Sequence, residues 1–97
     1  MSDDKLARQL KALAHPIRLG MMRRLAHEAE ICACDLGEAF AVSQPTVSEH
    51  LRVLREAGLV RTRRQGNTIC YAAVPEALER LTALLSTLQP KVRVKAA

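Results

Sequence analysis

The sequence predicts a mainly α-helical fold with a small β-hairpin, arranged as a winged helix-turn-helix that forms dimers. Three patterns support this fold class. Leucine and other apolar residues recur at helical spacing along most of the chain. A short turn at residues 41–43 separates two predicted helices, as in a helix-turn-helix. Two strand-like runs, 59–64 and 68–73, flank a glycine-containing turn at 65–67, which is typical of a hairpin.

The length and composition allow one small domain. A chain of 97 residues buries a limited fraction of its surface, and folds of this size often gain stability by association. Hydrophobic residues make up 48% of the chain, which predicts a packed core rather than disorder. Aromatic residues make up only 2%, which argues against a surface that stacks single-stranded bases. We expect a domain over residues 1–88 and a basic tail over residues 89–97.

Three helices are predicted before the turn. Leucines at spacings i, i+4 and i+7 give an amphipathic helix over residues 4–14. Pro16 ends that helix and suits the first turn of a second helix over residues 16–28, because proline has no backbone N–H. A short third helix is expected over residues 32–40.

The helix after the turn has the pattern of a DNA-recognition helix. Ser43 is its expected N-cap, because a serine hydroxyl accepts a backbone N–H from the first turn. Val47, Leu51 and Leu54 form one apolar stripe, and Gly58 lies just past the expected end of the helix. The opposite, polar face is therefore free to enter the major groove of DNA.

We expect this face and the following hairpin to bind double-stranded operator DNA. Gln44 suits a bidentate contact to adenine, and Thr46 suits a contact to thymine. Ser48 and His50 flank the face and suit phosphates, although packing against the other helices is an alternative for His50. The predicted DNA-binding residues are Ser43, Gln44, Thr46, Ser48, His50, Arg52, Arg61, Arg63, Arg64 and Asn67.

The positive charge lies mainly on this recognition unit and the C-terminal part. Residues 1–40 carry six basic and six acidic side chains, a net charge of zero. Residues 41–71 carry five arginines and two glutamates (+3), and residues 72–97 carry four basic and two acidic side chains (+2), which together give the net charge of +5. This distribution favours phosphate binding, although a solvated surface would give the same charge.

The last helix has more apolar surface than a domain of this size needs for its own core. Pro75 suits its first turn, and leucines then follow at a heptad-like spacing. We therefore expect the first and last helices to form a homodimer interface through Leu6, Leu10, Leu81, Leu84, Leu85 and Leu88.

Cys32 and Cys34 are the candidate metal ligands. Two residues apart on a helix, they would point about 200° apart, so one ion binds both only where the backbone is not helical. Ligation would then distort the start of the third helix, next to the recognition helix. Thiolates favour thiophilic ions and disfavour hard cations. The alternative is that both are small buried hydrophobic residues.

The third cysteine, Cys70, is expected to lie far from this pair. It alternates with Ile69 and Tyr71 along the second strand and therefore points to the opposite face. Packing or an exposed thiol is the favoured interpretation. An odd number of cysteines, three, argues against a secreted disulfide framework and favours the reducing cytoplasm.

With these residues in view, the chain resembles the ArsR/SmtB family of metal- and metalloid-responsive winged-helix repressors. The resemblance rests on residues 10–19, 30–36 and 43–51 and on the wing ending at Tyr71, within about residues 5–88. Residues 30–36, Glu-Ile-Cys-Ala-Cys-Asp-Leu, are similar to the Glu-Leu-Cys-Val-Cys-Asp-Leu box of the arsenite-sensing members. In those repressors, trivalent arsenic or antimony binds the cysteines and the dimer releases its operator.

The resemblance thus implies that Cys32 and Cys34 bind As(III) or Sb(III) as the inducer, with no organic cofactor. Many arsenite sensors with this box have a third cysteine shortly after it, where this chain has Gly37. The third coordination position is therefore open. The zinc site of related sensors is not expected, because the last helix offers only Glu76 and Glu79 and no histidine.

Three hypotheses follow. The first is a cytoplasmic, dimeric repressor that releases DNA when As(III) or Sb(III) binds the cysteine pair. The second keeps the DNA binding but makes the thiols redox sensors. The third is a thiol-based metal carrier or small oxidoreductase without DNA binding. Hydrolytic or nucleophilic catalysis is not expected, since no Gly-rich phosphate loop is present. Neither a membrane-spanning segment nor a signal peptide is expected.

Overall fold

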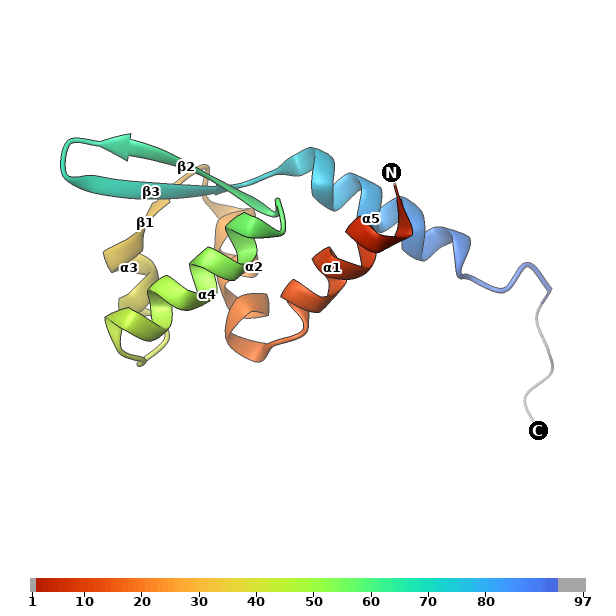
Figure 1. Cartoon of the computed structure of the whole chain (residues 1–97), viewed down its shortest axis with the longest axis horizontal. Coiled ribbons are helices and arrows are strands. Elements are labelled where there is room, and N and C mark those ends of the chain that lie inside the picture. The colour runs from red at the N-terminus through yellow and green to blue at the C-terminus, as the bar shows by residue number, and fades with distance from the viewer. Residues whose placement is uncertain (1, 93–97) are drawn as a thin grey trace.

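The computed structural model describes residues 2–92 and confirms the winged helix-turn-helix fold (Figure 1). In chain order the elements are α1 (Asp3–Leu13), α2 (Pro16–His27), β1 (Ile31–Cys32), α3 (Ala33–Glu38), α4 (Gln44–Glu56), β2 (Val60–Gln65), β3 (Thr68–Ala73) and α5 (Pro75–Thr87). α3 and α4 form the helix-turn-helix, and β2 and β3 form the wing.

Capping side chains and prolines define where the helices begin. The Ser2 hydroxyl accepts the Lys5 N–H at 3.3 Å at the start of α1. His15 caps α2 through its Nδ1, which accepts the Ile17 N–H at 3.1 Å. Ser43 caps α4, as predicted. Pro16 and Pro75 stand at the first positions of α2 and α5, where a missing N–H leaves no hydrogen bond unmade.

The sheet has three strands rather than the two that the sequence predicted. Its order is β1-β3-β2, with both pairings antiparallel, so β3 is the central strand. β1 consists only of Ile31 and Cys32, which pair with Tyr71 and Cys70. A two-residue strand is too short to show an alternating pattern, and this is why residue 32 was assigned to the third helix. That helix, predicted over 32–40, occupies Ala33–Glu38.

The core is built from aliphatic side chains of the helices and of β2. The predicted stripe Val47, Leu51 and Leu54 is buried there, together with Met21, Leu36 and Leu59. Two residues expected at the dimer interface also belong to this core: Leu6 is 8% exposed and Leu81 is 4% exposed. Both therefore contribute to the core of the subunit itself, and their part in a dimer interface stays a prediction.

His50 is also a core residue in this structure, and its side chain is not available to DNA. It is 9% exposed and packs against His15, with ring centroids 4.4 Å apart. Its Nδ1 lies 3.2 Å from Arg18 Nη1. Since arginine only donates, this nitrogen of His50 accepts and the ring is neutral with its proton on Nε2. Burial, followed by the charges of His15 and Arg18, lowers the pKa of His50 below its ordinary value.

α3 and α4 approach each other closely at Gly37. A Cβ atom at this position would lie 2.7 Å from Gln44 Nε2 and 3.4 Å from Val47 Cγ2. A side chain at position 37 therefore requires Gln44 to move. Gln44 is the first residue of α4, so this contact lies at the start of that helix.

The first turns of α5 pack on the core, and its last turns project beyond it. Figure 1 shows α3 and the tip of the wing toward one end of the molecule, with α5 toward the other. The molecule measures 55 × 29 × 23 Å along its principal axes. Leu85 is 50% exposed and Leu88 is 67% exposed, whereas Leu84 is half-buried. Within residues 2–92, no helix is long and apolar enough to span a membrane. Residues 93–97 of the predicted tail lie outside the described part.

Candidate functional site

The N-terminal turn of α4 presents polar side chains to solvent. Ser43, Gln44 and Ser48 are exposed, and Thr46 is half-buried. Ser43 Oγ accepts the Thr46 N–H at 3.4 Å and lies 3.0 Å from the Thr46 hydroxyl. The Ser43 cap therefore orients Thr46 and stabilises the first turn of α4, which carries the exposed side chains.

Arg52, predicted to contact DNA, is held by carboxylates of its own helix. Its Nε and Nη2 donate to Glu49 at 2.9 and 2.5 Å, and its Nη1 donates to Glu56. These hydrogen bonds and charges raise the pKa of Arg52 and lower that of Glu49. One guanidinium between two carboxylates leaves this cluster with a net charge of −1, so Arg52 offers a phosphate little attraction. The spacings i−3 and i+4 already indicated these pairs in the sequence.

The wing arginines differ in their partners. Arg61 Nη2 lies 3.3 Å from Glu76, and Arg63 makes a bidentate pair with Glu30 at 2.9 and 2.6 Å. The hydrogen bond from Arg63 holds the pKa of Glu30 below its usual range. Arg64 is exposed and has no carboxylate partner among residues 2–92. Arg64 is therefore the wing arginine most available to phosphate, and Asn67 lies exposed in the turn beside it.

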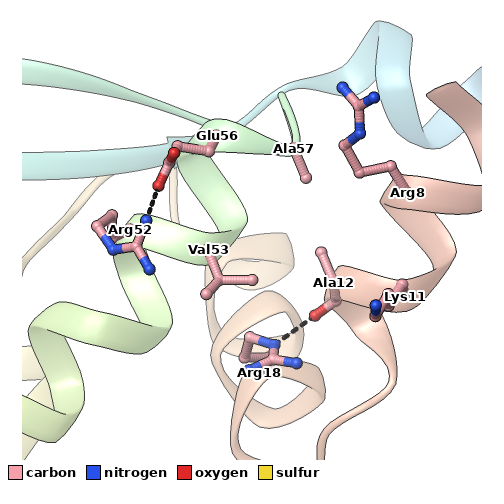
Figure 2. A pocket seen from close by; sticks show the side chains of 8 residues that line it. All are labelled: Arg8, Lys11, Ala12, Arg18, Arg52, Val53, Glu56 and Ala57. Carbon is pink, nitrogen blue, oxygen red and sulfur yellow. Dashed lines mark hydrogen bonds and ion pairs between the residues drawn. The ribbon is translucent and has the colours of Figure 1, made fainter.

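A basic pocket between α1 and α4 was not predicted from the sequence. Figure 2 shows Arg8 and Lys11 on α1 and Arg52 and Glu56 on α4, with Arg18 directed at the Ala12 carbonyl. Arg18 Nε donates to that carbonyl at 2.5 Å. Four cationic side chains against one carboxylate make the lining of this pocket positive, beside α4. The i, i+3 spacing of Arg8 and Lys11 was the available signal, but their proximity to α4 depends on helix packing.

The structure corrects the position of Cys70. Cys70 pairs directly with Cys32 across the sheet, and the two Sγ atoms are 2.9 Å apart. Cys70 is 3% exposed and Cys32 is half-buried. The prediction that Cys70 lies far from the other cysteines is wrong, because it treated the wing as a two-stranded hairpin without β1. Cys70 does alternate with Ile69 and Tyr71 along β3, as predicted. It therefore points to the face of the sheet on which Cys32, its partner in β1, also lies.

Cys34 lies apart from this pair. It is exposed in the first turn of α3, and its Sγ is 3.9 Å from Asp35 Oδ1. No three histidine, cysteine or carboxylate side chains converge on one point within residues 2–92. A three-ligand site that includes Cys34 therefore requires the first turn of α3 to rearrange.

The backbone between Cys32 and Cys34 is also not the continuous helix that the sequence predicted. Cys32 is the N-cap of α3, with extended φ and ψ of −73° and 151°, and only Cys34 is helical. The separation of about 200° expected on a helix does not apply to this pair. The hydrogen bond with Cys70, followed by burial, raises the pKa of Cys32 to about 11. The Cys32 thiol thus stays protonated at neutral pH.

A pocket of about 500 Å³ opens on Cys32 from the solvent. Four carboxylates contribute to its lining, with Arg24 as the cation. Such a pocket repels anions, whereas an uncharged molecule can reach the Cys32 sulfur. The residues that line it are Arg24, Glu28, Glu30, Ile31, Cys32, Asp35, Glu38 and Ala39.

Comparison with known proteins identifies the family. The model of the arsR family of bacterial regulatory proteins matches residues 15–62. The chain is 41% identical over 75 residues to the arsenic resistance transcriptional regulator ArsR1 of Pseudomonas putida, covering 77% of this chain and 59% of that protein. It is 43% identical over 79 residues to an arsenical resistance operon repressor of Staphylococcus xylosus, covering 81% of this chain and 75% of that protein.

A solved structure shows the same architecture. The homodimeric winged helix-turn-helix DNA-binding domain of a possible ArsR-family transcriptional regulator from Mycobacterium bovis superposes with a TM-score of 0.73 and 33% identity, covering 91% of this chain and 86% of that one. The fold, the matched family model and these relatives agree: the chain belongs to the arsR family of bacterial regulatory proteins.

Proposed function

We propose that this protein is a dimeric, cytoplasmic repressor that releases its operator DNA when As(III) or Sb(III) binds Cys32 and Cys34. The observation that carries the proposal is the position of these thiols at the junction of β1 and α3. From that junction, α3 reaches α4 through the close contact at Gly37. Relatives named for arsenic and arsenical resistance support the same chemistry.

The inducer would act through the first turn of α3. Cys34 is exposed and apart from Cys32, so an ion that takes both sulfurs pulls this turn toward the strand. α3 has only six residues, and a helix this short has little intrinsic stability of its own. α3 packs on α4 near Gly37, Gln44 and Val47, so a rearrangement of α3 would change its contacts with the start of the recognition helix. The inducer-bound form therefore holds α4 in an orientation that fits the major groove less well.

By thermodynamic linkage, the effects of the inducer and of operator DNA on each other's binding are equal. If the inducer weakens operator binding by a given factor, operator binding weakens the inducer by the same factor. A tenfold change in operator affinity corresponds to about 1.4 kcal/mol of coupling free energy. We expect the rearranged first turn of α3 to account for a change of this size.

Gel-shift titration on the DNA upstream of the protein's own gene tests the proposal. Saturating arsenite should lower the affinity of the wild type for this DNA at least tenfold. The Cys32→Ser/Cys34→Ser variant should bind the DNA equally well and show no response. Ala33→Ser, which changes the residue between the thiols and keeps both, should respond as the wild type does. Wild-type binding that ignores arsenite, or a full response of the double variant, contradicts the proposal.

We also propose that the DNA surface consists of the exposed first turns of α4 and the wing. Gln44, Thr46 and Ser48 are placed to reach base edges and nearby phosphates, with Ser43 holding the turn. Arg64 and Asn67 on the wing would contact the backbone. Arg61, Arg63 and Arg52 are weaker candidates, since glutamates already pair with them. The basic pocket of Arg8, Lys11 and Arg18 adds long-range attraction.

Arg64→Ala should weaken binding to operator and to unrelated DNA alike, because a phosphate contact carries no sequence information. The slope of log K against log salt should become shallower by about 0.9 for each Arg64 in the complex. Gln65→Ala, the uncharged neighbour, is the matched control and should keep the wild-type slope. A variant that keeps the slope but changes its base preference would assign Arg64 to base readout instead.

The dimer interface is proposed to be centred on α5. Leu84, Leu85 and Leu88 expose apolar surface where the helix leaves the rest of the fold, and Leu10 on α1 is 36% exposed. An exposed leucine row on a projecting helix is typical of a surface that a second copy covers. The homodimeric structure of the Mycobacterium bovis domain supports a dimer, and the interface on α5 is our proposal.

Sedimentation measures this interface directly. The Leu85→Glu/Leu88→Glu variant should sediment as a monomer at concentrations where the wild type is a dimer, because it buries two unpaired carboxylates. Ile69→Glu, which places the same charge on the exposed wing, should remain dimeric. A double variant that dimerises as tightly as the wild type places the interface elsewhere.

Thiol redox sensing is the second candidate function, and the Cys32–Cys70 distance of 2.9 Å favours it. Hydrogen peroxide would take one hydrogen from each thiol, joining the sulfurs as a disulfide and giving two waters. The raised pKa of Cys32 ranks this candidate second, since thiolate is the reactive form. Release of DNA by peroxide but not by arsenite, reversed by a reductant, would reverse this ranking.

A further inference from the structure

The juxtaposition of Cys32 and Cys70 bears on how the inducer site is completed. In an antiparallel pair, directly opposite residues point to the same face of the sheet, with Cβ atoms about 4.5–5.5 Å apart. Cys32 and Cys70 are such a pair, and their Sγ atoms are 2.9 Å apart. The register of β1 on β3 therefore holds two sulfurs together whatever the conformation of α3.

Two sulfurs that share one ion must lie within about twice a metal–sulfur bond, or ~4.6 Å when a bond of ~2.3 Å is assumed. The Cys32–Cys70 pair satisfies this limit without any movement. The only contact that Cys34 Sγ makes among the hydrogen bonds of the described residues is with Asp35, at 3.9 Å. The pair across the sheet is thus better prepared for a thiophilic ion than the pair along the chain.

α3 itself carries no further thiol, because Gly37 stands where many arsenite sensors have a third cysteine. A Cβ atom added at Gly37 would lie 2.7 Å from Gln44 Nε2. A trivalent metalloid forms three bonds, and the described part of the chain holds one more thiol near Cys32, which is Cys70. Four carboxylates line the pocket that opens on Cys32, which favours entry of uncharged arsenious acid over an anion.

We propose that Cys70 is the third ligand of the inducer, so that trivalent arsenic is bound by Cys32, Cys70 and Cys34. This inference rests on the proposed function. Arsenious acid would exchange its three As–O bonds for three As–S bonds, and each thiol proton would leave with a hydroxide as water. The oxidation state of arsenic and sulfur stays unchanged. Cys32 and Cys70 bind first, and Cys34 closes the site by leaving its position in α3.

This site joins the wing to the helix-turn-helix. Cys70 lies on the central strand, opposite Arg63 of β2 on one side and Cys32 on the other. Arg63 in turn binds Glu30, two residues before Cys32. Closing the site would therefore fix β1, β3 and α3 as one unit and draw the first turn of α3 away from its packing on α4.

X-ray absorption on arsenite-loaded protein, kept reduced with a phosphine rather than a thiol, counts the sulfur neighbours of arsenic. The wild type should show three, and Cys70→Ser should show two with an oxygen in the third place. In gel shifts, Cys70→Ser should need at least tenfold more arsenite for half-release of DNA. Ala72→Ser, two residues along the same strand, is the matched control and should behave as the wild type in both assays.

The inference fails if wild-type arsenic has two sulfur neighbours, or if Cys70→Ser keeps three neighbours and the wild-type dose. Should Cys70→Ser not fold, as judged by its circular dichroism, the wild-type count alone decides: three supports Cys70 and two overturns it. The proposed function fails separately, when the wild type binds arsenite without releasing DNA or does not bind it at all.

Discussion

The pairing of β1 with β3 is the constraint on which the rest of this structure depends. Two backbone positions, Ile31 opposite Tyr71 and Cys32 opposite Cys70, attach the segment before α3 to the wing. Buried Ile31 anchors the strand in the core, so that the adjacent cysteine has a fixed position. The start of α3, two thiols and the central strand of the wing are thereby joined at one point. A chemical event at sulfur then acts on both elements that are proposed to touch DNA.

Charge pairing divides the basic residues into those that build the fold and those that remain available. Arg52 and Arg63 are held by carboxylates on α4 and before β1, whereas Arg64 has no such partner within residues 2–92. Surface ion pairs of this kind contribute little to stability, about 0–1 kcal/mol each. These ion pairs instead orient the side chains involved: Arg63 on the wing toward Glu30, and Arg52 on α4 toward Glu49 and Glu56. A count of arginines in the sequence therefore overstates the charge that a phosphate meets.

Most of the fold could be predicted from the sequence, because it depends on local signals. Helical spacing of leucines, Pro16 and Pro75 at helix starts and the Ser43 cap are all readable within a few residues. The site was less predictable, because it depends on contacts between distant segments. β1 is two residues long, Cys70 is 38 residues from Cys32, and the burial of His50, Leu6 and Leu81 follows from helix packing. Gly37 indicated from the sequence only that the third coordination position is open, and it gave no signal that Cys70 lies beside Cys32.

Hydrogen exchange of backbone amides, measured with and without arsenite and in the absence of DNA, tests most directly whether sulfur binding moves the recognition helix. Exchange is expected to change at least tenfold in Ala33–Glu38 and in the first turn of α4, and to slow in β3 next to Cys70. Amides in the second half of α5 should not change. Release of the operator by arsenite with unchanged exchange from β1 to α4 would show that the signal does not travel through α3.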